Sequence, residues 1–261
     1  MLSRKRIQYV RSLEAKKYRK LHRAFVAEGN KLVADLMGAF ECEWMLAKPS
    51  WMATRGDIPA GELCVDLGDE IRKVSFLATP QDVIAVFKCP SYDLGCADAS
   101  SNLLLALDGV QDPGNLGTIV RLADWFGVEH IVCSADTADA FAPKAVQASM
   151  GALSRVRVHY TSLGSYLGEA FSRSIPLYGA FPGGEDLYGA GLSRSGILVM
   201  GNEGNGIRAE IEALIGHRLR IPSYPLGRTT SESLNVAVAT AIVCAEFRRR
   251  FISDLPPGRT P

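Results

Sequence analysis

The sequence predicts an α/β protein with two domains, the larger of which is built on a mostly parallel sheet flanked by helices. From Leu103 onward, apolar strand candidates alternate regularly with helix candidates, which is typical of a parallel sheet covered on both faces. A shorter alternation in the first part of the chain predicts a small α/β sandwich. The small and polar stretch SYDLGCADASSN separates the two. We therefore expect these parts: a first domain over 1–95, a linker over 96–102, a main domain over 103–254 and a tail over 255–261.

The elements of the first domain are expected in this order. The basic segment Ile7–Lys20 predicts a short helix. Beyond it, helix and strand patterns alternate through FVAEGNKLVADLM, CEWMLA, IRKVSFLA and VIAVFKC, and each strand candidate is short and apolar.

The second domain has six strand candidates and five helix candidates. Several of the strand candidates are continuously apolar, as expected for strands buried on both faces. The strands are expected over 103–110, 130–135, 155–160, 175–181, 196–201 and 217–222. The helices are expected over 116–127, 143–153, 162–171, 208–216 and 233–251. Ligands of such sheets bind at the carboxyl ends of the strands, so the segments after Val110, Met200 and Ile221 are the informative ones.

Composition excludes several classes of protein. The chain has 261 residues, 47% hydrophobic and 22% charged, which is ordinary for a soluble globular protein. Its longest apolar runs fall well short of the roughly 20 residues of a membrane helix, and the basic N-terminus lacks the apolar stretch of a secretory signal. Six scattered cysteines and four histidines show no ligand spacing. We expect a cytoplasmic protein with no disulfide framework, no metal site and no membrane partner.

The charge is distributed unevenly along the chain. Residues 1–31 carry ten Lys and Arg against two Glu, whereas residues 32–100 carry five basic and eleven acidic side chains. A basic segment on a neutral body is expected of a protein that binds a phosphate backbone, although a solvated helix face is the alternative. The candidate RNA-binding residues are Arg4, Lys5, Arg6, Arg11, Lys16, Lys17, Arg19 and Lys20.

The first informative loop is DGVQDPGNLGTIVRLADWFG. Its glycines predict a tight turn, and Asn115 is a candidate cap for the following helix. Arg121 lies among apolar residues and needs a partner: either Asp124 neutralises it, or its guanidinium faces a phosphate or a developing oxyanion. Both alternatives stay open at this point. Trp125 and Phe126 are expected in the core.

The second loop, VMGNEGNGI, has three glycines directly after a strand, which lets the backbone approach a ligand. It is neither the dinucleotide fingerprint nor a P-loop, so a nucleotide-using enzyme of another class is disfavoured. By itself, the loop is more typical of an ordinary glycine-rich turn, with Glu203 near the next helix.

The third segment, IPSYPLGRTTSESLNV, leads into a helix that is apolar or small nearly all round and is therefore expected to be buried. Ser231 or Ser233 is the expected N-cap. The first turn also presents Glu232 and Asn235, and a polar Asn just inside an apolar helix favours a role in a site.

Together the three loops resemble the three motifs of the SpoU (TrmH-like) family of RNA ribose 2′-O-methyltransferases, in the SPOUT superfamily. The matching stretches are NLGTIVRLADWFG, LVMGNEGNGI and ESLNVAVATAI. The N-terminal RSLEAKKYRKLHRAFVAEGNKLV is similar to the RNA substrate-binding domain often found in front of this catalytic domain. The linker SYPLGRTTS, which contains Arg228, is about four residues longer than the connection that is usual in the family.

The resemblance implies an S-adenosylmethionine-dependent enzyme, a trefoil knot in the chain, and a homodimer whose site is completed across the interface. It implies structured RNA as substrate, with ribosomal RNA preferred; transfer RNA, or a non-catalytic RNA-binding or ribosome-assembly factor, is the alternative. The positions implied to bind the cofactor are Gly201, Ile221 and Leu234. The implied catalytic residues are Asn115, Arg121, Glu203, Ser233 and Asn235. Because a guanidinium is almost always protonated, we expect Arg121 to hold a phosphate and stabilise the developing alkoxide.

Overall fold

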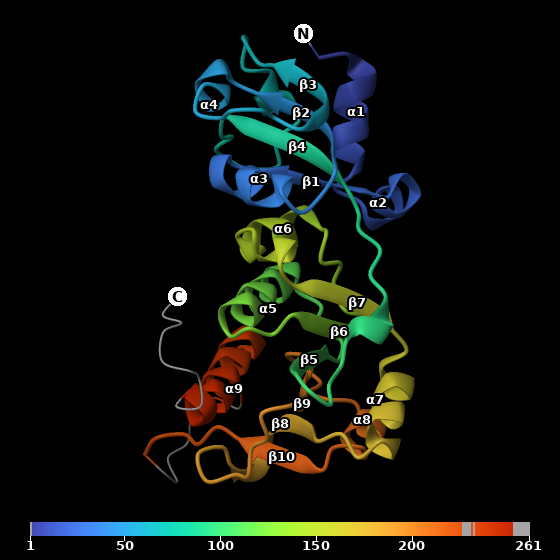
Figure 1. Cartoon of the computed structure of the whole chain (residues 1–261), viewed down its shortest axis with the longest axis vertical. Helices are drawn as coiled ribbons and strands as arrows, with labels where there is room; N and C mark the ends of the chain where they lie inside the picture. Colours follow the sequence, from blue (N-terminus) through green and yellow to red (C-terminus); the bar gives the residue numbers. More distant parts are fainter. Residues whose placement is uncertain (1, 226–230, 232, 253–261) are drawn as a thin grey trace. The chain divides into compact units, whose positions relative to one another are not determined.

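The computed structural model describes residues 2–225, 231 and 233–252. The chain divides into two compact units (Figure 1). Unit 1 comprises Met1–Ser91, Leu116–Arg121 and Asp139–Arg155, and unit 2 comprises Tyr92–Asn115, Leu122–Ala138 and Val156–Pro261. Each unit is assembled from non-contiguous segments, so the contiguous domain bounds expected from the sequence stay a prediction.

Unit 1 is an α/β sandwich on a four-stranded sheet with the order β1-β4-β2-β3. β2 and β3 run parallel, whereas β4 is antiparallel to both β1 and β2. Its elements are α1 (Arg4–Ser12), α2 (Lys16–His22), β1 (Ala24–Glu28), α3 (Asn30–Met37), β2 (Cys42–Ala47), α4 (Pro49–Met52), β3 (Ala60–Val65), η1 (Glu70–Lys73), β4 (Val83–Lys88), α6 (Pro143–Ser149) and η3 (Ala152–Ser154).

The sheet of unit 1 is covered by apolar side chains on both faces. On one face, Val10 and Leu13 pack against Val26 and Trp44, all of them fully or almost fully buried. An aromatic cluster on Phe25 covers the other face, where Phe25 contacts the rings of the side chains Phe40, Phe87 and Phe141. This burial explains why the short apolar strands fold into one sheet.

Two predictions for unit 1 are wrong: the single helix over residues 7–20 and the strand in IRKVSFLA. The expected helix over residues 7–20 is two helices, because the chain is extended at Ala15 and the guanidinium of Arg19 takes up the carbonyls of Leu13 and Glu14. The segment IRKVSFLA forms no strand. It begins with the short 3₁₀ helix η1, whose start is fixed by Asp66: its carboxylate accepts backbone hydrogen bonds from Glu70 and Ile71. The fourth strand is β3, whose mostly exposed side chains gave no apolar signal.

Unit 2 contains a six-stranded parallel sheet with the order β10-β8-β9-β5-β6-β7. The six predicted strands are confirmed. Its elements are η2 (Leu94–Cys96), β5 (Leu103–Leu107), β6 (His130–Ser134), β7 (Arg157–Thr161), α7 (Leu163–Ser172), β8 (Leu177–Asp186), β9 (Gly196–Met200), α8 (Ala209–Glu212), β10 (His217–Arg220) and α9 (Val236–Phe251). Helix α5 (Pro113–Trp125) has residues in both units.

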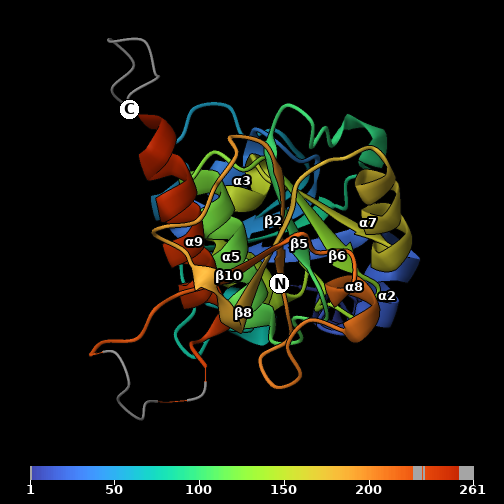
Figure 2. The same ribbon diagram turned by 90° about the horizontal axis from the view of Figure 1, so that it is seen from below.

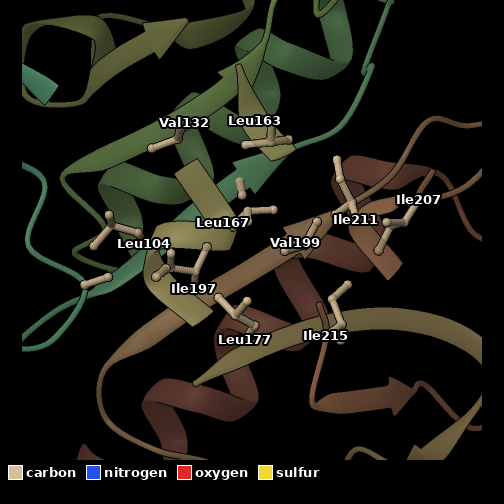
Figure 3. Close-up of a cluster of buried hydrophobic side chains, with 13 residues drawn as sticks. Leu104, Val132, Leu163, Leu167, Leu177, Ile197, Val199, Ile207, Ile211 and Ile215 are labelled. Carbon is tan, nitrogen blue, oxygen red and sulfur yellow. The ribbon is translucent and has the colours of Figure 1, made fainter. Parts of the chain in front are cut away.

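The core of unit 2 lies between its sheet and α7 and α8. Figure 3 shows Leu163 and Leu167 of α7 packed with Ile197 and Val199 of β9, and Ile211 of α8 completes the cluster. Figures 1 and 2 place α9 on the opposite side of this sheet from α7. The sheet is therefore covered on both faces, which is why its central strands β5 and β9 are apolar and buried along their whole length.

Of the helices described here, none combines the length and apolar composition that a membrane crossing requires. Five cysteines have described side chains and all are free thiols. Burial raises the pKa of the Cys244 thiol to about 12, so this thiol stays protonated and unreactive at neutral pH.

Candidate functional site

The candidate site lies at the carboxyl edge of the parallel sheet in unit 2. β5 and β9 are neighbours in this sheet. From β5 the chain adds β6 and then β7 on one side of β5. It then crosses to the other side of β5, where β9, β8 and β10 lie. A crevice outside such a switch point is where open α/β sheets bind ligands. The loops that follow β5 and β9 are the first two loops singled out in the sequence.

The first loop turns sharply at Gly109, whose φ of +71° favours glycine. Helix α5 then begins with Pro113 at its first position, and the side chain of Asp112 accepts a hydrogen bond from the backbone N–H of Asn115 at 2.9 Å. The expected capping role of Asn115 is therefore wrong: Asp112 is the N-cap. Because Asp112 takes over this role, the side chain of Asn115 is released for other contacts.

The second loop is a tight turn closed by its own polar groups. The backbones of Asn202 and Gly206 exchange hydrogen bonds of 2.9 and 3.0 Å. The Asn202 side chain donates to the carbonyl of Gly109 at 2.7 Å and so joins this turn to the first loop. A Cβ at Gly201 would lie 2.3 Å from the backbone carbon of Gly206, so only glycine fits there. The glycine-rich turn is thus a rigid wall joined to the first loop.

A buried carboxylate, which the sequence analysis missed, fixes the two loops together. Asp108 is 1% exposed and follows β5 directly. Its carboxylate accepts hydrogen bonds from the backbone N–H of Arg208 at 2.8 Å and from the Arg208 Nε at 2.7 Å. Hydrogen bonding to Asp108 also raises the pKa of Arg208, which keeps its guanidinium charged. The sequence signal that could have identified Asp108 is an acidic residue directly after a continuously apolar strand.

The third segment is anchored by Asn235. Its side-chain oxygen accepts hydrogen bonds from the backbone N–H groups of Ala237 at 3.0 Å and Val238 at 3.3 Å. Asn235 is therefore the N-cap of α9, and the prediction of Ser231 or Ser233 in that role is wrong. Ser233 and Leu234 are exposed. The predictions for Arg228 and Glu232 fall outside the described residues.

Three predicted site residues form one chain of hydrogen bonds. The Asn235 side-chain nitrogen donates to Asn115 Oδ1 at 3.0 Å, and the Asn115 nitrogen donates to Glu203 Oε1 at 2.7 Å. The helix cap fixes the orientation of both amides, because Asn235 Oδ1 must face the N–H donors, which leaves its nitrogen to donate. Residues 88 and 120 positions apart thereby meet. The chain ends on a carboxylate whose acceptor capacity exceeds one bond.

Arg121 lies on α5, the helix that carries Asn115 in its first turn. It is exposed, and its guanidinium makes no ion pair or hydrogen bond within the described part of the chain. The predicted burial of Trp125 is wrong, because this side chain is 82% exposed. Phe126 is half-buried. The exposed side of α5 therefore presents a cation and a large aromatic ring.

The positions predicted to bind the cofactor fit a ligand read through the backbone. Gly201 directly follows β9, and Ile221 directly follows β10. Both residues are half-buried. Within the described residues, their backbone N–H and C=O groups make no hydrogen bond. Half-buried backbone groups that lack partners favour a polar ligand. The missing Cβ at Gly201 lets the backbone of Gly206 and Ile207 pack directly against it, which keeps the loop wall closed.

The basic residues of the N-terminal segment are mostly accessible. Arg4, Lys5, Arg11, Lys16, Lys17 and Lys20 are exposed, and Arg6 is half-buried. The prediction that Arg19 binds RNA is wrong. Its side chain is 4% exposed, and its guanidinium donates to Asp139 at 2.7 and 2.9 Å. It stabilises unit 1 and is not available to RNA, because its hydrogen-bonding groups are already used within the protein.

Comparison with known proteins places these features in a family. Residues 102–245 match the SpoU rRNA Methylase family, and residues 4–85 match the MRM3-like substrate binding domain. The chain is 32% identical to the 23S rRNA (guanosine(2553)-2′-O)-methyltransferase RlmP of Bacillus subtilis, over 94% of this chain and 99% of the relative. It is 32% identical to the 23S rRNA (guanosine-2′-O-)-methyltransferase RlmB of Neisseria meningitidis, over 70% of this chain and 74% of the relative.

Two solved structures extend the comparison. A TrmH-family protein from Porphyromonas gingivalis superposes with a TM-score of 0.87 at 42% identity, covering 96% of this chain and 99% of that one. An AdoMet-bound rRNA methyltransferase from Sinorhizobium meliloti superposes with a TM-score of 0.81 at 27% identity, covering 96% of both chains. The likeness includes both parts of the chain and a relative that holds the expected cofactor.

Proposed function

The chain belongs to the SpoU rRNA Methylase family, and from this premise we propose that Asn115, Arg121, Glu203, Ser233 and Asn235 form its catalytic site. The reaction is the transfer of a methyl group from S-adenosylmethionine to a ribose 2′-hydroxyl of ribosomal RNA. The observation that carries the proposed site is the hydrogen-bonded chain from Asn235 through Asn115 to Glu203. It joins all three sequence motifs at the edge of the sheet where ligands bind.

The cofactor, when bound, supplies a methyl group activated by a sulfonium. Gly201, Ile221 and Leu234 would hold it through their backbone groups, with the Gly201 turn as a rigid wall. The Asn202 and Asp108 contacts keep this wall fixed against the first loop. A fixed wall lowers the entropic cost of bringing the two reacting groups into line.

The protein must also bring the 2′-hydroxyl into line with the methyl group, and the hydroxyl proton passes to solvent water as the oxygen is methylated. Glu203, held by Asn115, is an exposed carboxylate that hydrogen-bonds the target nucleotide. Arg121 holds the adjacent phosphate and stabilises the alkoxide that develops as the hydroxyl attacks. Its exposure and its lack of any described partner support this role. Ser233 adds a hydroxyl beside Asn235 at the start of α9.

The RNA assignment is proposed more narrowly as 23S ribosomal RNA, because the relatives RlmP and RlmB carry that substrate in their names. The exposed basic residues Lys5, Lys16, Lys17 and Lys20 would supply salt-sensitive affinity for the phosphate backbone. The target nucleotide is expected to be unpaired, because a 2′-hydroxyl within a regular helix is hard to approach in line. We place the enzyme in the cytoplasm, where its substrate is made and assembled.

A homodimer is proposed from the surface of α5 and α9. Val238 on α9 is 49% exposed, Ile252 beyond its end is 66% exposed, and Trp125 at the end of α5 is 82% exposed. Arg248 ties the two helices together by donating to the carbonyls of Phe126 and Gly127 at 2.6 and 2.9 Å. Large exposed apolar side chains on these two helices favour a protein interface, and a second copy that covers Val238 would lie beside Asn235.

Transfer of labelled methyl groups tests the proposed site. Tritiated S-adenosylmethionine is supplied with unmodified 23S ribosomal RNA, 16S ribosomal RNA or transfer RNA, and cofactor binding is measured in parallel. We expect label in 23S ribosomal RNA and its loss in Arg121→Ala, while the cofactor still binds. The matched control is Arg155→Ala, which removes another arginine outside the site. Equal transfer by Arg121→Ala and the unaltered enzyme contradicts the role given to Arg121.

A further inference from the structure

A second candidate binding site lies in unit 1, within the N-terminal part that matches the substrate binding domain. It is an open cavity of about 490 Å³ beside α1 and β2, here called the α1 pocket. Its size is within the range of about 300–1,000 Å³ that is typical of small-molecule sites. The α1 pocket is lined by Ser3, Lys5, Arg6, Tyr9, His22 and Glu43.

One wall of the α1 pocket is aromatic. The rings of Tyr9 and His22 meet edge to face with centroids 5.1 Å apart. Behind His22, the ring of Tyr18 lies nearly parallel to it at 6.3 Å. His22 itself is exposed, so the edge-to-face contact orders the ring while a face of it stays open to solvent. Aromatic faces ordered in this way are the surfaces on which proteins stack unpaired RNA bases.

A carboxylate lies at the inner end of this wall. The Tyr9 hydroxyl donates to Glu43 and lies 3.1 and 3.3 Å from its two oxygens. Burial and the neighbouring Glu43 raise the pKa of Tyr9, so the hydroxyl remains a donor and holds the carboxylate in place. A carboxylate accepts about four hydrogen bonds, so this contact leaves acceptor capacity on both oxygens. The two oxygens can receive a pair of adjacent N–H donors.

This acceptor pair selects among the four bases. Guanine presents two neighbouring donors on its Watson–Crick edge, the N1–H and the 2-amino group. Cytosine and adenine present one amino group beside an acceptor nitrogen, and uracil presents one N–H between two carbonyls. A carboxylate that reads a base edge with both oxygens therefore favours guanine. The other three bases would place an acceptor against Glu43, at an electrostatic cost.

The opposite end of the α1 pocket suits a phosphate. Ser3 caps α1, a nine-residue helix with no acidic side chain in its first turn, so partial positive charge collects there. Lys5 is exposed at the same end. Arg6 lies over the ring of Trp44 at 5.5 Å and forms an ion pair with Glu62, which keeps it at the pocket rim. Base-binding and phosphate-binding groups thus line one cavity.

We propose that the α1 pocket binds an unpaired guanine nucleotide of the RNA substrate, with the base stacked on the His22 wall, its Watson–Crick edge on Glu43 and its phosphate at Ser3 and Lys5. The identity of the ligand as part of an RNA rests on the proposed function. The binding of a guanine nucleotide does not, because it requires neither cofactor nor methyl transfer.

Calorimetric titration of the full chain with guanosine 5′-monophosphate tests the pocket directly. We expect guanosine monophosphate to bind at least about tenfold more tightly than the adenosine, cytidine and uridine monophosphates, because a hydrogen bond to a charged group is a strong one. Inosine monophosphate, which lacks the 2-amino group, should lose most of this preference. Equal binding of all the nucleotides, or no binding, overturns the proposal.

Matched variants assign the binding to this pocket. Glu43→Gln keeps the shape of the side chain and the Tyr9 contact, and it should bring guanosine monophosphate down to the level of the other nucleotides. Glu41→Gln, which removes an exposed carboxylate paired with Lys88 and outside the pocket lining, should bind as the unaltered protein does. His22→Ala should weaken all four nucleotides alike. Asn115→Ala, in the catalytic site, should leave this binding intact; loss of binding in Asn115→Ala but not in Glu43→Gln places the nucleotide elsewhere and overturns the proposal.

Methyl-transfer kinetics then separate an RNA nucleotide from a free nucleotide. In Glu43→Gln we expect KM for 23S ribosomal RNA to rise about tenfold with kcat unchanged, because the pocket contributes to binding of the substrate and not to the transfer step. Unchanged KM overturns the assignment to RNA and leaves a free guanine nucleotide as the ligand. Guanine-selective binding in a protein that transfers no methyl group to any RNA contradicts the proposed function alone.

Discussion

At the scale of single residues, the site depends on which polar side chain performs which local task. Asp112 caps α5 and Asn235 caps α9, so Asn115 is free to join Asn235 to Glu203. The sequence motifs identified the members of this chain but assigned one cap wrongly to Asn115 and the other to a serine. Asn, Asp and Ser have nearly equal preferences for the N-cap position. Which of several neighbouring candidates becomes the N-cap therefore depends on the path of the backbone.

Substitutions at Asn235 separate its two contacts. Asn235→Ala removes the cap and should lower the free energy of unfolding by about 1 kcal/mol. Asn235→Asp keeps an equally good cap but loses the nitrogen that donates to Asn115. We expect near-normal stability for Asn235→Asp and a kcat at least about tenfold lower in both variants, since catalytic groups must be held in position. Chemical denaturation and single-turnover transfer measure the two quantities.

The account of Asn235 fails if Asn235→Asp transfers methyl groups as fast as the unaltered enzyme. In that case the contact between the two amides contributes only to the structure of the loop.

At the scale of loops and strands, the Gly201 turn is the element proposed to hold the cofactor. A Cβ at Gly201 meets backbone atoms at 2.3 to 2.5 Å, whereas a Cβ at Gly204 meets only the Asn202 side-chain oxygen at an ordinary 3.5 Å. Gly201→Ala must therefore displace the turn. We expect it to lower the affinity for S-adenosylmethionine at least about tenfold, because a misplaced binding wall loses several contacts together.

Gly204→Ala is the control for this change, since it adds the same methyl group to the same turn. It should bind the cofactor normally in a calorimetric titration. Equal affinities of the two variants would show that the backbone at Gly201 does not form the cofactor wall.

The strand pair β6–β7 carries a pH-dependent element. His130 and His159 are buried, with ring nitrogens 2.9 Å apart. Burial, then the neighbouring His130 and Arg157, lowers the pKa of His159 to about 4 from an ordinary value of 6.5. Burial also lowers the pKa of His130. The folded pair therefore stays neutral where the unfolded chain takes up protons.

This difference sets the sign of the pH dependence. The free energy of unfolding should decline as the pH falls from about 6.5 towards 4, because only the unfolded state gains protons in that window. Above it, the pair should cause no change. We expect His159→Gln to show a smaller decline than the unaltered protein when urea unfolding is compared at neutral pH and at about pH 5. Identical slopes in the two proteins would contradict this assignment.

The elements of unit 2 were largely predictable, and those of unit 1 less so. The continuously apolar strands, β5 and β9 above all, gave strong signals because both faces of the sheet are covered. β3 gave none, because it is an edge strand with exposed side chains. Asp108 was missed because burial and its bonds to Arg208 are long-range facts, 100 residues apart. The trefoil knot implied by the resemblance does not follow from periodicity, and it stays a prediction.

At the scale of the whole molecule, the exposed apolar surface of α5 and α9 predicts self-association. From the sequence, α9 is expected to be buried, since it is apolar nearly all round, and Trp125 is expected in the core. Both expectations assumed that one chain supplies all the covering side chains. The proposed second copy would remove the disagreement, because the surface that is exposed in one chain would be buried in the pair.

Sedimentation velocity of surface variants tests the dimer. Trp125→Glu places a charge in the centre of the proposed interface and should yield single chains, with reduced methyl transfer, since desolvating an unpaired charge is costly. Leu67→Glu is the matched control: it alters another strongly exposed apolar residue, 85% accessible and in unit 1. A single-chain mass for the unaltered protein, or an unchanged dimer in Trp125→Glu, contradicts this interface.

The central claim is that the chain methylates a ribose 2′-oxygen, and the position of the transferred methyl group tests it most directly. Alkali cleaves RNA through attack by the 2′-hydroxyl, so a nucleotide methylated there resists cleavage. Ribosomal RNA labelled from tritiated S-adenosylmethionine is hydrolysed in alkali and separated by size. We predict that the label is found in alkali-resistant dinucleotides and is absent after reaction with Arg121→Ala. Label in mononucleotides would place the methyl group on a base and would contradict the account.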